Sequence, residues 1–220
     1  MNLIHYGLQR SGTNYLETLL TKNYKVRILN SNKDRTSPVQ KHFRLYDQKD
    51  IISDPQYYND IIIKDIDDLE CFFDVIPDYY LVISKDPYSW YLSYSRWARK
   101  CRWPSVKHHY IEEYNLFYGK LLSLSEKTDR FIFVKYGDLL TDTIGTLQQL
   151  EYDMKLKKKL LSSIRMNVPR KVAQSKWFSD KKRHDYINKT YLSEYTSTEL
   201  KELNNRLDST VAGLLGYQQE

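Results

Sequence analysis

Five short apolar runs, each bounded by polar turn residues, set the fold class of this chain. Most of them are continuously apolar, which is typical of parallel strands covered on both faces. The segments between them are long enough for crossover helices. The sequence therefore predicts an α/β fold with a central, mostly parallel five-stranded sheet flanked by helices, in a single domain spanning 1–220. The predicted strands are 2–6, 26–29, 61–64, 80–84 and 131–135.

Charge and hydropathy limit the classes of partner. The chain has 220 residues, a formal net charge of +6 and a pI near 9.0, so its surface potential attracts anions such as cofactor phosphates, glycans or nucleic acid. No stretch approaches the roughly 18 apolar residues of a membrane span, and the first residues lack a signal-peptide pattern. We expect a cytoplasmic protein. Cys71 and Cys101 are far apart, in no ligand-like spacing, and are expected to be reduced thiols.

Helical spacing is clearest in the second half of the chain. The segment 105–126 carries one apolar stripe and is predicted to be a helix. A last helix begins with a capping box, Thr196 and Glu199, and stops at Gly216. Between them, 170–189 is basic, aromatic and poorly periodic, which indicates either a solvated loop or part of a ligand lid. The apolar stripe of the last helix is Leu200, Leu203, Leu207, Val211 and Leu214.

The stretch "LIHYGLQRSGTNYLETLL" has the order strand, glycine turn, helix start. Such a turn aims backbone N–H groups and the positive end of a helix dipole at one point, which makes an anion site. Gly7 and Gly12 have the Walker A spacing, but Thr13 and Asn14 stand where Lys and Ser or Thr should follow, which disfavours magnesium-dependent hydrolysis. Arg10 is either a solvated turn residue or a cation that forks two phosphate oxygens.

The stretch "YLVISKDPYSWYLSYSRWAR" repeats the order strand, turn, helix. Pro87 suits the first turn of a helix, where its missing N–H costs nothing. Lys85 at the strand end and Ser93 two turns into the helix could close on one phosphate beside the sheet. Alternatively, Lys85 is solvated and Ser93 is a neutral helix residue. The aromatic residues that would then pack in the core, at helical spacing, are Trp90, Tyr94 and Trp97.

Together these motifs resemble the sulfotransferase family that uses 3'-phosphoadenylyl sulfate (PAPS). In that family "[RK]-S-G-T-[TN]-[WY]" forms the 5'-phosphosulfate loop, which matches "RSGTNY" at 10–15. A basic residue followed eight positions later by Ser holds the 3'-phosphate, which matches Lys85 and Ser93, although Arg is commoner at the first position. The segment 131–140, "FIFVKYGDLL", is similar to the family's strand ending in Tyr-Glu-Asp-Leu, with Gly137 in place of Glu.

The resemblance implies a P-loop-like sulfotransferase architecture and a PAPS-dependent activity without a metal, with adenosine 3',5'-bisphosphate as product. It implies that the loop cradles the 5'-phosphate and sulfuryl group, that Tyr15 stacks on the adenine and that Tyr136 edges it. The family's late R-K-G element has no clear match, and Arg170–Lys171 is the nearest candidate. The residues expected to contact the cofactor are Arg10, Ser11, Gly12, Thr13, Asn14, Tyr15, Lys85, Ser93 and Tyr136.

Sulfuryl transfer to an alcohol needs a base for the acceptor proton, and histidine is suited to that role near neutral pH. We select His42 in "QKHFRLYD", because Lys41 and His42 resemble the Lys-His pair that precedes the acceptor site in bacterial members of the family. Lys41 would disfavour a second positive charge on His42 and could contact the leaving oxygen. We expect His5 to be a satisfied core residue and His108, His109 and His184 to be solvated.

A carboxylate is the rival base. "IIIKDIDDLE" places Asp65 and Asp67 just after a predicted strand, at the edge where ligands of open α/β sheets bind. These residues are either part of an acceptor site or a solvated acidic helix start. The sequence leaves the acceptor open, because a hydroxyl of a glycan and one of a small natural product both fit.

Two other functions compete with this hypothesis. A P-loop nucleotide kinase would use the Asp of "IIIKD" or "VISKD" and magnesium, but the Walker Lys that reaches the β/γ phosphates is missing. A non-enzymatic nucleic-acid binder would use the basic residues and some of the 20 tyrosines. Because Lys and Arg are interspersed with acids along most of the chain, we expect no specific nucleic-acid partner.

Overall fold

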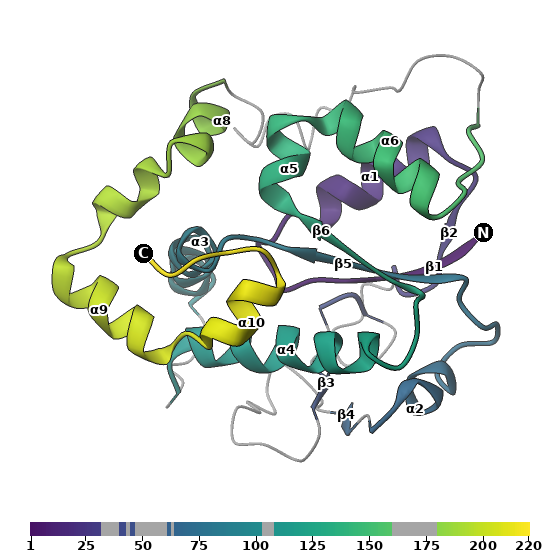
Figure 1. Cartoon of the computed structure of the whole chain (residues 1–220), viewed down its shortest axis with the longest axis horizontal. Coiled ribbons are helices and arrows are strands. Elements are labelled where there is room, and N and C mark those ends of the chain that lie inside the picture. Colours follow the sequence, from purple (N-terminus) through teal and green to yellow (C-terminus); the bar gives the residue numbers. More distant parts are fainter. Residues whose placement is uncertain (32–39, 43–44, 47–60, 63, 103–107, 160–179) are drawn as a thin grey trace.

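A four-stranded sheet lies at the centre of the computed structural model, and all its strands are parallel, in the order β2-β1-β5-β6 (Figure 1). The strands are β1 (Asn2–Tyr6), β2 (Arg27–Ile28), β5 (Tyr79–Ser84) and β6 (Phe131–Lys135). The structure describes residues 1–31, 40–42, 45–46, 61–62, 64–102, 108–159 and 180–220.

The predicted α/β class and parallel sheet are confirmed, but the predicted number of five strands in that sheet is wrong. Four of the five apolar runs form the sheet. Ile61–Ile62 forms β4, which pairs with β3 (Leu45–Tyr46) in a separate two-stranded sheet. Just after β2, the Asn30 side chain continues the pairing with β1: Asn30 accepts from the His5 amide and donates to the His5 carbonyl, both at 2.8 Å.

Helices cover both faces of the sheet, as expected for parallel strands (Figure 1). One face packs against α1 (Thr13–Asn23), α5 (Tyr136–Thr141) and α6 (Thr143–Asp153). The other face packs against α4 (Tyr110–Ser125), α9 (Ser197–Arg206) and α10 (Ser209–Leu214).

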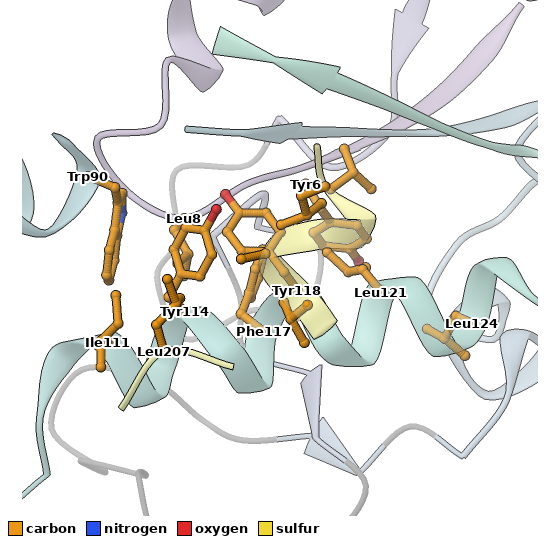
Figure 2. Close-up of a cluster of buried hydrophobic side chains, with 14 of the residues drawn as sticks. Tyr6, Leu8, Trp90, Ile111, Tyr114, Phe117, Tyr118, Leu121, Leu124 and Leu207 are labelled. Carbon is orange, nitrogen blue, oxygen red and sulfur yellow. The ribbon is translucent and has the colours of Figure 1, made fainter. Parts of the chain in front are cut away.

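The aromatic side of α4 ties this helix to the central strand β5. Figure 2 shows the rings of Tyr114 and Tyr118 rising from α4 toward the sheet. The Tyr114 hydroxyl donates to the Lys85 carbonyl and the Tyr118 hydroxyl donates to the Ile83 carbonyl, both at 2.9 Å. Buried hydroxyls need such partners, and these two bonds fix the backbone at the carboxyl end of β5.

Three elements gather around the carboxyl edge of the sheet. Helix α3 (Pro87–Lys100) follows β5 directly, with Pro87 in its first turn as predicted, and Asp86 caps it by accepting from the Ser89 amide. Helix α8 (Asp180–Ile187) packs beside α5, and the 3-10 turn η1 (Thr190–Glu194) packs beside α3. The basic segment predicted as a loop or lid thus ends in a helix at this edge.

The predicted last helix is two helices. The capping box of Thr196 and Glu199 is present at the start of α9. Leu207 is extended, and Asp208 caps α10 by accepting from two amides. This break shifts the helical phase, so that Leu215 is buried whereas Leu214 is 64% exposed.

Two further expectations concern the surface. Cys71 and Cys101 are free thiols in this structure, and both are exposed. Within the described part of the chain, no helix combines the length and the apolar character needed to cross a bilayer.

Candidate functional site

Three strand ends converge on one edge of the sheet. Because β1, β5 and β6 are parallel, the loop after Tyr6, Lys85 after β5 and Tyr136 after β6 all lie at the carboxyl edge. This edge is where open α/β sheets bind ligands. The two sequence motifs therefore meet there, as the hypothesis of one shared ligand requires.

The first loop depends on its two glycines. A Cβ on Gly7 would lie 2.8 Å from both the Ile83 carbonyl oxygen and Ser11 Oγ. Gly12 has φ 97°, and a Cβ there would lie 2.4 Å from Tyr136 Cδ2. The loop is closed by Ser11, whose hydroxyl donates to the Leu8 carbonyl at 2.7 Å. Only glycine at position 12 lets the chain pass under the Tyr136 ring and turn into α1.

Helix α1 begins at Thr13 without a side-chain cap in the described structure. The first amides of a helix lack partners within the helix, and together with the dipole they make this end of α1 suited to an anion. Asn14 is exposed and Thr13 is buried in the first turn. Walker-type magnesium ligation is not available from these two side chains at the usual positions.

Arg10 connects the loop to α3. Its Nε donates to Ser93 Oγ at 3.2 Å, and its guanidinium carbon lies 4.9 Å from the centre of the Trp97 ring. Its backbone has φ 74°, which is uncommon for a residue with a side chain. Partial burial lowers the pKa of Arg10 from its ordinary value, but the group stays charged. The first motif and the second are thus in direct contact.

Lys85 and Tyr136 form the opposite wall. The Lys85 ammonium donates to the Ser89 carbonyl at 3.2 Å and lies 5.6 Å from the centre of the Tyr136 ring. Lys85 is only 8% exposed, which corrects the alternative that it is solvated. Burial raises the pKa of Tyr136 to about 12, so its hydroxyl stays protonated. A buried ammonium at the wall of a cavity favours an anionic ligand there.

These groups enclose one cavity of about 680 Å³, a size typical of ligand pockets. Among the described residues of its lining, four cations outnumber two carboxylates, Asp185 and Glu194. The lining residues that the motifs predicted are Arg10, Lys85, Ser93 and Tyr136. The charged residues that they did not predict are Arg96, Lys100, Asp185 and Glu194, of which Arg96 pairs with Glu194.

Aromatic residues that the motifs did not predict complete the cavity. Trp90 and Tyr94 pack in the core as the alternative interpretation of α3 predicted, but Trp97 lines the cavity. Tyr186 of α8 and Tyr191 of η1 form a further wall. The Tyr186 ring is possible only because residue 137 is glycine: a Cβ there would lie 2.8 Å from Tyr186 Cε1. In the sequence, the only hint of this contact was Gly137, which stands where the resembled family has Glu.

Tyr15 does not take the predicted stacking position. The residue is 1% exposed within the cluster under α1, α5 and α6. Its hydroxyl lies 3.4 Å from Thr143 Oγ1. In this structure the ring serves core packing, because Tyr15 shares its face of α1 with Leu16 and Leu19.

Lys41 and His42 lie beside the glycine loop. The Gly7 amide donates to the Lys41 carbonyl at 3.2 Å, and His42 Nδ1 lies 2.7 Å from the Gly7 carbonyl oxygen. A carbonyl only accepts, so Nδ1 carries the proton and Nε2 is the basic nitrogen of the neutral ring. The Lys41 ammonium pairs with Glu17 of α1. His42 borders the loop but does not line the cavity.

Among the other histidines, His5 lies in the core as predicted but is not satisfied by the described residues, and the prediction that His108 is solvated is wrong. His5 is 0% exposed, and neither ring nitrogen has a hydrogen-bond partner among the described residues. Burial, with Lys41 and His42 nearby, lowers the pKa of His5 well below its ordinary value. His108 is not solvated, because its Nε2 lies 2.8 Å from Glu113 Oε1 in a buried pair. His184 is exposed, as predicted.

The acidic cluster lies away from the cavity. Asp65 caps the short helix α2 (Ile66–Glu70) by accepting from the Asp68 amide. Glu70 of this helix accepts from Arg130, which precedes β6, so α2 lies at the amino edge of the sheet (Figure 1). Asp65 and Asp67 therefore do not join the predicted site, since Ile61–Ile62 does not extend the main sheet. Arg170–Lys171 lies outside the described residues.

In comparisons with known proteins, no family model matches this chain and no curated protein is significantly similar to it. The function must therefore be inferred from the site's own geometry and chemistry.

Proposed function

We propose that this protein is a PAPS-dependent sulfotransferase with a P-loop-like architecture. The observation that carries the proposal is that Arg10 of the first motif and Lys85 and Ser93 of the second line one cavity, with Arg10 hydrogen-bonded to Ser93. A doubly phosphorylated adenosine needs two cationic positions on the same side of the sheet. Two cations of the cavity lining support this: Arg10, just before the uncapped start of α1, and the buried Lys85.

In this proposal, side chains and backbone amides of the chain bind the donor, stabilise the developing charge and accept the acceptor's proton in an in-line transfer. Arg10 and the first amides of α1 hold the 5'-phosphosulfate and stabilise the negative charge that develops on its bridging oxygen. Lys85 and Ser93 hold the 3'-phosphate, and Tyr136 edges the adenine. His42 Nε2 takes the proton of the acceptor hydroxyl as its oxygen forms a bond to sulfur. The bond from sulfur to the bridging oxygen breaks, and adenosine 3',5'-bisphosphate leaves.

The loop chemistry explains why a Walker lysine is not needed. A transferring sulfuryl group carries less negative charge than a terminal phosphate, so backbone amides and side-chain cations are sufficient to meet it. Thr13 and Asn14, in place of the Walker Lys and hydroxyl, agree with this activity better than with a kinase. The acceptor in this proposal is a hydroxyl of a glycan or of a small natural product.

Ligand-induced stabilisation tests the proposal directly. Adenosine 3',5'-bisphosphate at about 100 times its Kd should add about 2.7 kcal/mol to the unfolding free energy. For a chain of this size that corresponds to a rise in Tm of roughly 5–10 °C. The measurement is differential scanning fluorimetry in EDTA, so that any magnesium is chelated.

The same experiment distinguishes the competing functions. A shift given by ATP only when magnesium is added would favour a nucleotide kinase. A shift given by a single-stranded oligonucleotide that disappears at high salt would favour a nucleic-acid binder. No shift with saturating adenosine 3',5'-bisphosphate would contradict the proposal.

His42→Ala is expected to reduce turnover by about 10²-fold or more while leaving the affinity for adenosine 3',5'-bisphosphate unchanged, because a general base acts on the acceptor proton. Turnover is measured with radiolabelled sulfate donor against a panel of hydroxylated acceptors. His184→Ala, at an exposed position on α8, is the matched control. Undiminished turnover in His42→Ala would assign the proton transfer to another group.

A further inference from the structure

Trp97 has a contact that the proposed function does not use. It lies on α3, one turn beyond Ser93, and lines the cavity. Two cations lie over its ring: the Arg10 guanidinium carbon at 4.9 Å and the Lys100 ammonium at 5.7 Å from the ring centre. Trp97 is half-buried and belongs to neither of the hydrophobic clusters of the described core. Core packing therefore does not account for a tryptophan at this position.

Arg10 needs external support to act as a fixed cation. Its side chain has many rotamers, and an arginine that binds an anion must give up that freedom. Its backbone also has the uncommon φ of 74°, a conformation that persists only when the surroundings enforce it. The hydrogen bond from Nε to Ser93 fixes one edge of the guanidinium, and the Trp97 ring supports its plane.

We propose that Trp97 is a positioning residue for Arg10, which it holds in the cavity ready to meet the phosphate end of the ligand. The inference rests on the proposed function, because it names what makes Arg10 effective in that site. Preorganisation of this kind increases affinity by reducing the entropy that binding costs. From the strength of a partly desolvated cation–π contact, losing the ring should weaken anion binding by about 5- to 30-fold.

The test is a titration of adenosine 3',5'-bisphosphate by calorimetry in EDTA. Trp97→Ala should raise Kd by about 5- to 30-fold, and Trp97→Phe, which keeps an aromatic face, should recover most of that loss. Tyr152→Ala removes an exposed aromatic ring of α6 and should bind as the wild type does. A Trp97→Ala protein that is folded by circular dichroism but binds with unchanged Kd would overturn the inference while leaving the proposed function standing.

A double-mutant cycle separates positioning from direct contact with the ligand. If Trp97 acts through Arg10, then Trp97→Ala should cause little further loss in an Arg10→Ala background. A full additional loss in that background would show that the ring binds the ligand itself, and would overturn the positioning role.

A ligand-free measurement keeps the two proposals distinguishable. Phenylglyoxal modifies exposed arginines, and mass spectrometry of the Arg10 peptide follows its rate without any nucleotide present. Trp97→Ala should speed modification of Arg10, while the peptide that carries Arg27, which is exposed, should react at an unchanged rate. Faster modification together with no nucleotide binding by the wild type would overturn the proposed function and the ligand role of Arg10, but not its packing on Trp97. An unchanged rate would contradict the positioning contact.

Discussion

Gly12→Ala is expected to lower the free energy of unfolding by about 2–5 kcal/mol. Two costs combine: a side chain at φ 97° costs about 1–2 kcal/mol, and a Cβ placed 2.4 Å from Tyr136 Cδ2 forces local shifts that cost about 1–3 kcal/mol. Urea unfolding followed by circular dichroism measures the change, with the m-value as a check that the transition stays two-state.

Gly213→Ala is the matched control for this substitution. Gly213 lies in α10, and a Cβ built on it would have no neighbour within 4 Å. Because alanine is the better helix former and restricts the unfolded chain, this variant should be about 0.4–1 kcal/mol more stable than the wild type. If both alanine variants were equally stable, the left-handed turn and the close passage under Tyr136 would not be features of the folded protein.

The sheet could be predicted from the sequence because burial on both faces leaves a local signal. The runs that became β1, β5 and β6 are mostly apolar, and their limits agree with the structure to within one residue. The choice of which strands pair with each other leaves no such local signal. Nothing local in 61–64 indicates that Ile61–Ile62 pairs with Leu45–Tyr46 and stays outside the main sheet.

The candidate site was predictable to the extent that topology determines it. Parallel strands bring their carboxyl ends to one edge, so the loop at Arg10 and the strand end at Lys85 had to lie near each other. Side-chain direction was harder to predict. Trp90, Tyr94 and Trp97 share one helical stripe, yet the first two are buried in the core and the third lines the cavity.

The remaining wall comes from a distant segment. Tyr186 and Tyr191 follow a basic stretch without periodicity, and their position depends on packing against α5 and α3. The absence of a side chain at Gly137 marks where Tyr186 fits. This fit between Gly137 and Tyr186 can be recognised only when α5 and α8 are packed against each other.

Lys85→Met should weaken binding of adenosine 3',5'-bisphosphate by about 10²-fold, because it removes a buried charge that would meet the 3'-phosphate. Methionine keeps the length of the side chain beside Tyr136, and loss of an ammonium that is 8% exposed should leave stability unchanged or raise it. Adenosine 5'-phosphate lacks the 3'-phosphate, so its Kd for Lys85→Met should stay within about threefold of its Kd for the wild type. Calorimetric titration of both nucleotides measures the two effects.

Arg10→Ala provides the complementary result. This residue is assigned to the 5' end, so its loss should weaken both nucleotides, by about 10-fold or more. Lys135→Met is the matched lysine control. Lys135 ends β6 at the same edge of the sheet but is not among the described residues that line the cavity of about 680 Å³. Selective loss of the bisphosphate in Lys85→Met and common loss in Arg10→Ala would assign one phosphate to each cation. Equal losses for both nucleotides in Lys85→Met would mean that this ammonium contributes only to the general potential of the cavity, and a separate 3'-phosphate site at Lys85 would have to be abandoned.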